Sequence, residues 1–75
     1  MMTTDQLRYM IEQAIPESRV EVTDLTGTSD HFGVHVVSSS FEGKTLLEQH
    51  KMIHAACGDH LTTTIHALQI KTETP

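Results

Sequence analysis

Histidine and cysteine are the side chains of this 75-residue chain best suited to metal chemistry, and the chain has six histidines and one cysteine. Imidazole and thiolate groups hold zinc, copper and iron centres. Their spacing in the sequence already excludes one pair of histidines from binding the same metal ion. His31 and His35 lie roughly 13 Å apart if the segment is extended, because a strand rises about 3.3 Å per residue. These two histidines therefore cannot share one ion.

Three further histidines and the cysteine have ordinary structural interpretations. His50 and His54 are one helical turn apart and could bind a metal, but no glutamate follows His50 as in a zinc-protease helix and no third ligand is evident. We interpret them as an ordinary, partly exposed helix face. His60 is expected to be solvated in a loop. Cys57 ends an apolar helical stripe, which favours a small core residue over a nucleophile.

The elements that position these residues follow from the hydrophobic pattern. Apolar residues recur at helical spacing between Leu7 and Ile15, so a helix is expected over 4–15, capped by Thr4 or Asp5 and ended by Pro16. Two alternating segments follow, one around Val20 and Val22 and one at Phe32, Val34 and Val36. Turn-rich residues 26–30 join them, which predicts a hairpin.

The second half of the chain predicts a helix and a final strand. Thr45 and Glu48 form a capping box that starts the helix, and Gly58 is placed to end it. The apolar residues of this helix are Leu46, Leu47, Ile53, Ala56 and Cys57. Residues 59–64 have no assigned structure, and Ile65 to Ile70 is the last strand. The chain is thus expected to be one α+β domain over 1–75, a three-stranded mixed sheet with its helices on one face.

Composition narrows the class of protein. The formal charge of −5 and pI of about 5.5 describe an acidic surface with five scattered basic residues, which disfavours phosphate backbones. A single cysteine excludes an internal disulfide framework and fits a reducing compartment. No leader of signal-peptide type and no apolar run of membrane-spanning length is present. We therefore expect a cytoplasmic protein that is not bound to a membrane.

The expected topology brings His31 and His66 to one end of the sheet. If the second and third strands are adjacent and parallel, their first residues share a rim, with strands about 4.8 Å apart. The two imidazoles can then face one exposed metal centre. By alternation, however, His31 falls on the outer face and His66 on the face of Leu68 and Ile70, so the preceding loop must turn His31 around the edge. The alternative is that His66 only caps or packs the strand.

Two segments carry a family resemblance. Residues 37–54 contain Phe41, Gly43 and the triplet Gln49-His50-Lys51, and a separate segment reads Ile65-His66-Ala67-Leu68. From about Leu7 to Pro75 the chain resembles the BolA-like family. The resemblance implies a class II KH-like fold (α-β-β-α-β) and a non-enzymatic partner of monothiol glutaredoxins, which binds a [2Fe-2S] cluster shared with the glutaredoxin and glutathione.

The resemblance also implies the site residues. The histidine of the Ile-His-Ala-Leu motif carries over to His66 as a cluster ligand. Relatives usually place a second histidine or cysteine in the loop between the first two strands, and His31 is the nearest residue here. Neutral imidazoles in place of thiolates raise the potential of such a cluster. Because the ligating imidazoles must be unprotonated, cluster capture is expected to weaken as the pH drops through about 6.5.

The sequence favours two other classes of function less. A nucleic-acid-binding regulator of transcription or the stress response is the alternative, because the fold resembles KH domains, but no two glycines are three apart, so no GXXG clamp exists. An enzyme would need a nucleophile, and Ser38 to Ser40 with His35 lack an orienting acid; the serines are expected to satisfy backbone groups where the strand ends. Alone, the chain is expected to be a monomer or a weak homodimer.

Overall fold

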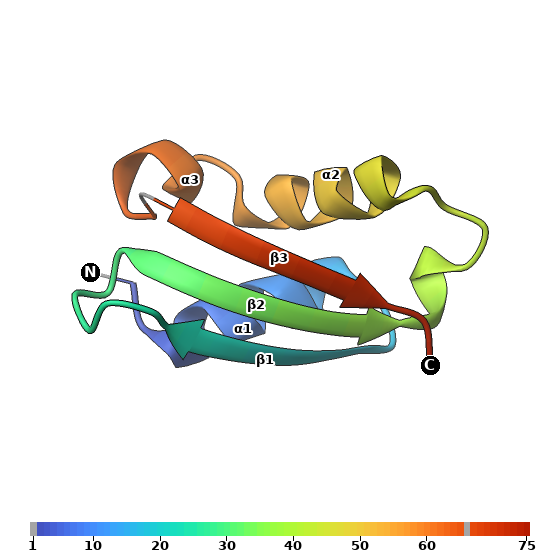
Figure 1. The fold of residues 1–75 in the computed structure, drawn as a ribbon, viewed down its shortest axis with the longest axis horizontal. Coiled ribbons are helices and arrows are strands. Elements are labelled where there is room, and N and C mark those ends of the chain that lie inside the picture. Colours follow the sequence, from blue (N-terminus) through green and yellow to red (C-terminus); the bar gives the residue numbers. More distant parts are fainter. Residues whose placement is uncertain (1, 66) are drawn as a thin grey trace.

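The computed structural model describes residues 2–65 and 67–75 and arranges them as one sheet with its helices on one side (Figure 1). In chain order the elements are α1 (Thr4–Ala14), β1 (Ser18–Asp24), β2 (His31–Ser38), the 3-10 turn η1 (Ser39–Phe41), α2 (Leu46–Cys57), α3 (His60–Thr63) and β3 (Ala67–Glu73). The expected α+β architecture is confirmed, with the short α3 added between α2 and β3.

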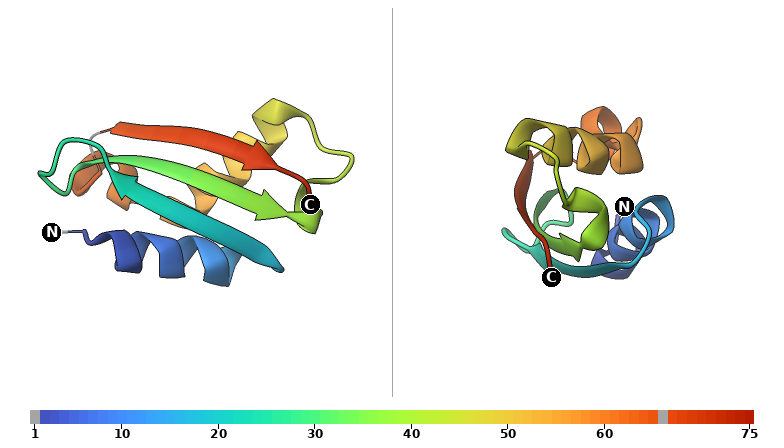
Figure 2. Two further views of the ribbon diagram at one scale, coloured as in Figure 1. Left: turned by 60° about the horizontal axis from the view of Figure 1, so that its bottom comes forward. Right: turned by 90° about the vertical axis from the view of Figure 1, so that its right-hand side faces the viewer.

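The sheet has the strand order β1-β2-β3. β1 runs antiparallel to β2, and β2 runs parallel to β3, so that Val34 pairs with Val22 on one side and with Ile70 on the other. Every second residue of β2, starting at Phe32, is buried. That face carries α1 and α2, and the opposite face of the sheet is open (Figure 2). The alternation predicted for β2 is therefore the alternation observed.

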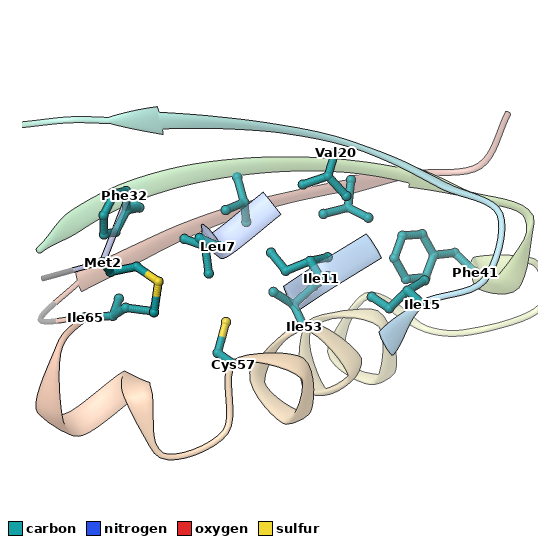
Figure 3. Packing of buried hydrophobic residues seen from close by; sticks show 12 residues of the cluster. Met2, Leu7, Ile11, Ile15, Val20, Phe32, Phe41, Ile53, Cys57 and Ile65 are labelled. Atoms are coloured by element: carbon teal, nitrogen blue, oxygen red, sulfur yellow. The ribbon is translucent and has the colours of Figure 1, made fainter. Parts of the chain in front are cut away.

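The core lies between the helices and the covered face of the sheet (Figure 3). Phe41 is buried at the end of the sheet where β2 stops. Cys57 is buried at the end of α2, as the sequence predicted. The expected apolar stripe of α2 is wrong at its start. Leu46 and Leu47 are 63% and 65% exposed, because the first turn of α2 lies beyond the part of the helix that packs on the core.

The capping residue at the N-terminus of α1 lies one position before the residues that the sequence predicted. Thr3, rather than Thr4 or Asp5, caps this helix: its hydroxyl accepts from the Gln6 amide at 3.0 Å, and the Gln6 side chain accepts from the Thr3 amide at 2.9 Å. α1 ends at Ala14, just before Pro16. The Thr45 capping box of α2 is present as predicted.

The last strand starts later than expected. The Ile65 amide donates to the His60 carbonyl at 2.7 Å, so Ile65 belongs to the turn that follows α3 and is buried there. β3 begins at Ala67 and continues past Ile70 to Glu73. The apolar character of Ile65 reflects packing against the core rather than a place in the strand.

The serine segment after β2 satisfies backbone groups, as the sequence predicted. The Ser38 hydroxyl donates to the Pro16 carbonyl at 2.8 Å and accepts from the Ser40 amide at 3.1 Å. The Ser40 hydroxyl also donates to Pro16, at 3.2 Å. These bonds tie the turn before β1 to the exit of β2, and thereby to the loop that leads into α2.

Candidate metal-binding rim

One end of the sheet gathers the candidate ligands; we call it the rim. β1 ends there, β2 and β3 begin there, and residues 25–30 connect β1 to β2 (Figure 1). His31 pairs with Ala67 across the parallel strands. The Ala67 amide donates to the Asp30 carbonyl at 3.2 Å, and the Leu25 amide donates to the His31 carbonyl at 2.8 Å. The predicted meeting of two parallel strands at one rim is therefore confirmed in the described residues.

The loop at the rim is organised by the carboxylate of Asp24. Its two oxygens accept from the Gly27 amide at 2.9 Å and from the Ser29 amide at 3.0 Å. Gly27 and Ser29 both have positive φ, +74° and +62°. A glycine takes this conformation without steric cost, whereas for Ser29 the bond to Asp24 helps to hold it. The loop thus delivers Asp30 and His31 to the rim in a defined conformation.

His31 is held by the residue before it. Its Nδ1 lies 2.8 Å from the Asp30 carboxylate, and the Thr28 hydroxyl donates to the same carboxylate oxygen. The hydrogen bond assigns the proton of the neutral imidazole to Nδ1 and the lone pair to Nε2. Histidines that bind metals are commonly oriented by a carboxylate in this way. The side chain of His31 is 41% exposed, so the rim is open to a partner.

Asp30 and Thr28 are functional candidates that the sequence reasoning missed. The signal was available, because an aspartate directly before a candidate histidine ligand can reach its Nδ1. The interpretation of 26–30 as a turn alone gave no reason to assign its side chains a role. In the structure they form the support of His31.

His66, the other predicted ligand, lies outside the described residues. The structure places its two neighbours: Ile65 is buried, and Ala67 is the first residue of β3 and the pairing partner of His31. Within 2–65 and 67–75, no three His, Cys, Asp or Glu side chains come together in a way that could hold an ion. His31 therefore needs ligands from beyond this set to complete a metal site.

His60 is exposed as expected, but it is the first residue of α3 and does not lie in a loop. The other three histidines of the described chain lie on β2 and α2. His35 is four residues further along β2 and pairs with Lys71, and its Nε2 lies 3.4 Å from the Glu73 carboxylate without the geometry of a hydrogen bond. His50 is half-buried on α2, and His54 is exposed one turn later. The described residues bring neither of them to a third ligand.

Cys57 is not available to the rim. Its side chain is 1% exposed within the core, and burial raises the pKa of the thiol above its usual value. A buried thiol with a raised pKa is a poor nucleophile and a poor metal ligand. The interpretation of Cys57 as a core residue is confirmed.

The basic residues do not form a surface for nucleic acid. Arg8 lies 3.4 Å from Asp5 on α1, and Lys71 lies 3.3 Å from Glu73 on β3. The other three are exposed on separate elements: Arg19 on β1, Lys44 before α2 and Lys51 on α2. Phosphate backbones are bound by clustered cations, so nothing in the described residues favours the nucleic-acid alternative. In the same residues, each helix is too short and too polar to cross a membrane.

Comparison with known proteins agrees with this fold. The family described as BolA-like protein matches residues 7–75. BolA-like protein 1 of Pongo abelii is 38% identical over 76 residues, covering 92% of this chain and 56% of that protein. The chain thus spans little more than half the length of the mammalian relatives of that name.

Two solved structures superpose closely. The bolA protein homologue from Coxiella burnetii is 39% identical, with a TM-score of 0.84, over 100% of this chain and 94% of the other. Yeast Fra2 is 37% identical, with a TM-score of 0.80, over 97% and 80%. The sequence match and the shared fold define the class of protein, a small α+β domain. This chain belongs to the BolA-like family. The family is generally non-enzymatic.

Proposed function

We propose that this chain is a non-enzymatic protein that binds a monothiol glutaredoxin and ligates a shared [2Fe-2S] cluster through His66 and His31. Its role would be iron-sulfur cluster trafficking or iron and redox sensing. Membership of the BolA-like family supports the class of function. The observation that carries the site is the pairing of His31 with Ala67, the residue next to His66, at an exposed rim.

The chain's own residues contribute orientation and charge. Asp30 holds the His31 ring through Nδ1, and Thr28 holds Asp30, so the ring keeps one tautomer and one direction. Neutral imidazole adds no negative charge to an iron centre, and this raises the potential of a [2Fe-2S] cluster when one is bound. The local support of His31 fits a histidine that must present the same nitrogen each time a partner docks.

The chain does not supply the thiolates. Cys57 is its single cysteine and is buried. The remaining ligands would come from the cysteine of the glutaredoxin and from glutathione, so that neither protein completes the site alone. Because both of these thiols must be reduced, we propose that the protein acts in the cytoplasm. Before the glutaredoxin binds, it would be a monomer or a weak homodimer.

A reconstitution experiment tests this function. The chain is mixed with a monothiol glutaredoxin, glutathione, iron and sulfide, and visible absorption and circular dichroism spectra are compared for the native chain, His66→Ala and His31→Ala. His54→Ala is the matched control, because His54 is an exposed histidine on α2. We expect altered spectra from both rim variants and the native spectrum from the control.

The outcomes separate the two ligands. A native spectrum from His66→Ala would show that the site is wrongly assigned. If only His31→Ala leaves the spectrum unchanged, the second ligand must be sought among His35, Cys57 and the other histidines.

A further inference from the structure

A second group of potential metal ligands lies between α1 and α3. A cavity of about 290 Å³ is lined by Met2, Gln6, Met10, His60 and Thr64. Residues four positions apart lie on the same side of a helix. Met2, Gln6 and Met10 therefore line one side of α1 and the residues before it, and His60 and Thr64 line one side of α3. Two short stripes of side chains therefore face each other across the cavity.

The polar groups of two lining residues are already engaged. The side-chain carbonyl of Gln6 accepts from the Thr3 amide in the cap of α1. The Thr64 hydroxyl lies 3.4 Å from the His60 carbonyl, to which it donates, and 2.9 Å from His60 Nδ1. The Nδ1 atom of His60 can donate a proton to the Thr64 oxygen, and a metal bound at Nε2 would select this tautomer. The lone pair of His60 is then on Nε2.

Among the described lining residues, the groups left for a ligand are two thioether sulfurs and one imidazole nitrogen. Met2 is 4% exposed and belongs to the same buried cluster as Ile65 (Figure 3), and Met10 packs at the edge of that cluster. None of the lining residues that the structure describes carries a carboxylate. Thioethers are soft ligands that select Cu(I), whereas Mg²⁺, Ca²⁺ and Mn²⁺ require hard oxygen donors.

We propose that this cavity is a binding site for a soft monovalent cation, Cu(I), held by the sulfurs of Met2 and Met10 and by His60 Nε2. The Thr64 hydroxyl contacts Nδ1 of His60 and so orients the imidazole, as is usual for a metal-binding histidine. Methionine has three rotatable bonds, so both sulfurs can turn toward an ion without movement of the helices. The site does not depend on the cluster ligands at the rim.

Competition for Cu(I) tests the proposal on the full chain. The protein is titrated anaerobically, with ascorbate as reductant, against the Cu(I)-selective chelator bicinchoninate. We expect one equivalent of Cu(I) to be bound, and Met10→Leu and His60→Gln each to weaken binding about tenfold or more, in the range typical of altered metal sites. Met52→Leu and His54→Gln, which replace a methionine and a histidine of α2, are the matched controls and should leave the affinity unchanged.

A second measurement uses the unaltered protein, so it does not depend on the folding of a variant. Silver(I), which is a redox-stable probe for Cu(I) sites, should shift the NMR signals of the Met2 and Met10 methyl groups and leave that of Met52 in place. The proposal fails if the native chain does not compete with bicinchoninate, if Met52→Leu weakens binding as much as Met10→Leu, or if Cys57→Ser abolishes binding, which would assign the metal to the thiol.

Discussion

Ser38 is the buried polar residue among those that the structure describes, and its replacement by alanine tests how the elements around it are joined. Ser38 is 0% exposed. Its hydroxyl is the acceptor for the Ser40 amide and one of two donors to the Pro16 carbonyl. In Ser38→Ala the Pro16 carbonyl still accepts a hydrogen bond from the Ser40 hydroxyl. The partly buried Ser40 amide, in contrast, loses its acceptor.

The size of the effect follows from that difference. Leaving a buried donor without a partner costs about 1–3 kcal/mol, and the partial burial of the Ser40 amide favours the lower part of this range, about 1–2 kcal/mol. A chain of this length has a total unfolding free energy of roughly 4–11 kcal/mol, at about 0.05–0.15 kcal/mol per residue. At about 4–8 °C per kcal/mol, the melting temperature should fall by about 5–15 °C.

Urea unfolding followed by circular dichroism measures this free energy, and Ser39→Ala is the control. The Ser39 hydroxyl donates to the Glu17 carboxylate at 2.7 Å on the exposed surface, so its loss should cost less than about 0.5 kcal/mol. Equal unfolding free energies for the two variants would refute the reasoning, because they would show that the Ser38 bonds contribute no more than a surface contact.

Three further predictions follow from single residues. Burial raises the pKa of the Cys57 thiol, so alkylation of Cys57 should be slow in the folded protein and fast in urea. The contribution of the protonated thiol to stability should be complete below the ordinary thiol pKa and lost as the pH rises through the folded-state pKa. Cys57→Ala should not show this loss. Hydrogen bonds to Thr45, first from its backbone amide and then from its hydroxyl, lower the pKa of Glu48. The free energy of unfolding should therefore fall as acid protonates Glu48, as measured by urea unfolding between pH 3 and 6. Glu48→Gln should lack this fall in stability. Gly58 has φ +57° and ψ −137°, a backbone conformation that strains other residues, so Gly58→Ala should lower the free energy of unfolding by about 1–3 kcal/mol in thermal unfolding. Gly33→Ala is the control and should cost little, because the atoms nearest to its added methyl group belong to the flexible Leu25 side chain.

Local patterns predicted most of the fold. The alternation at Phe32, Val34 and Val36 and the Thr45 capping box depend on neighbouring residues, and both are present. The errors arose where tertiary packing decides. Ile65 is apolar because it packs in a turn, and Leu46 is exposed because its helix turn extends past the core. The Thr3 cap was missed by one residue because the adjacent Thr4 offers the same hydroxyl.

The candidate site was predictable only as far as it depends on the order of the elements in the sequence. The parallel pairing of β2 and β3 follows from the order of elements, and it brings His31 to the residue next to His66. The support by Asp30 and Thr28 depends on the loop conformation that Asp24 imposes, which no short motif announced. The cavity between Met10 and His60 depends on how the fold places α1 relative to α3, and these residues are fifty positions apart in the sequence.

The most direct test of the central claim is to count the nitrogen ligands that this chain gives to the cluster. The histidines of this chain alone are labelled with ¹⁵N, the complex with an unlabelled glutaredoxin and glutathione is assembled and reduced, and pulsed electron paramagnetic resonance is recorded. Histidine ligation by this chain predicts two strongly coupled ¹⁵N nuclei, with one lost in His66→Ala and the other in His31→Ala. A reduced cluster without any coupling to ¹⁵N would contradict it.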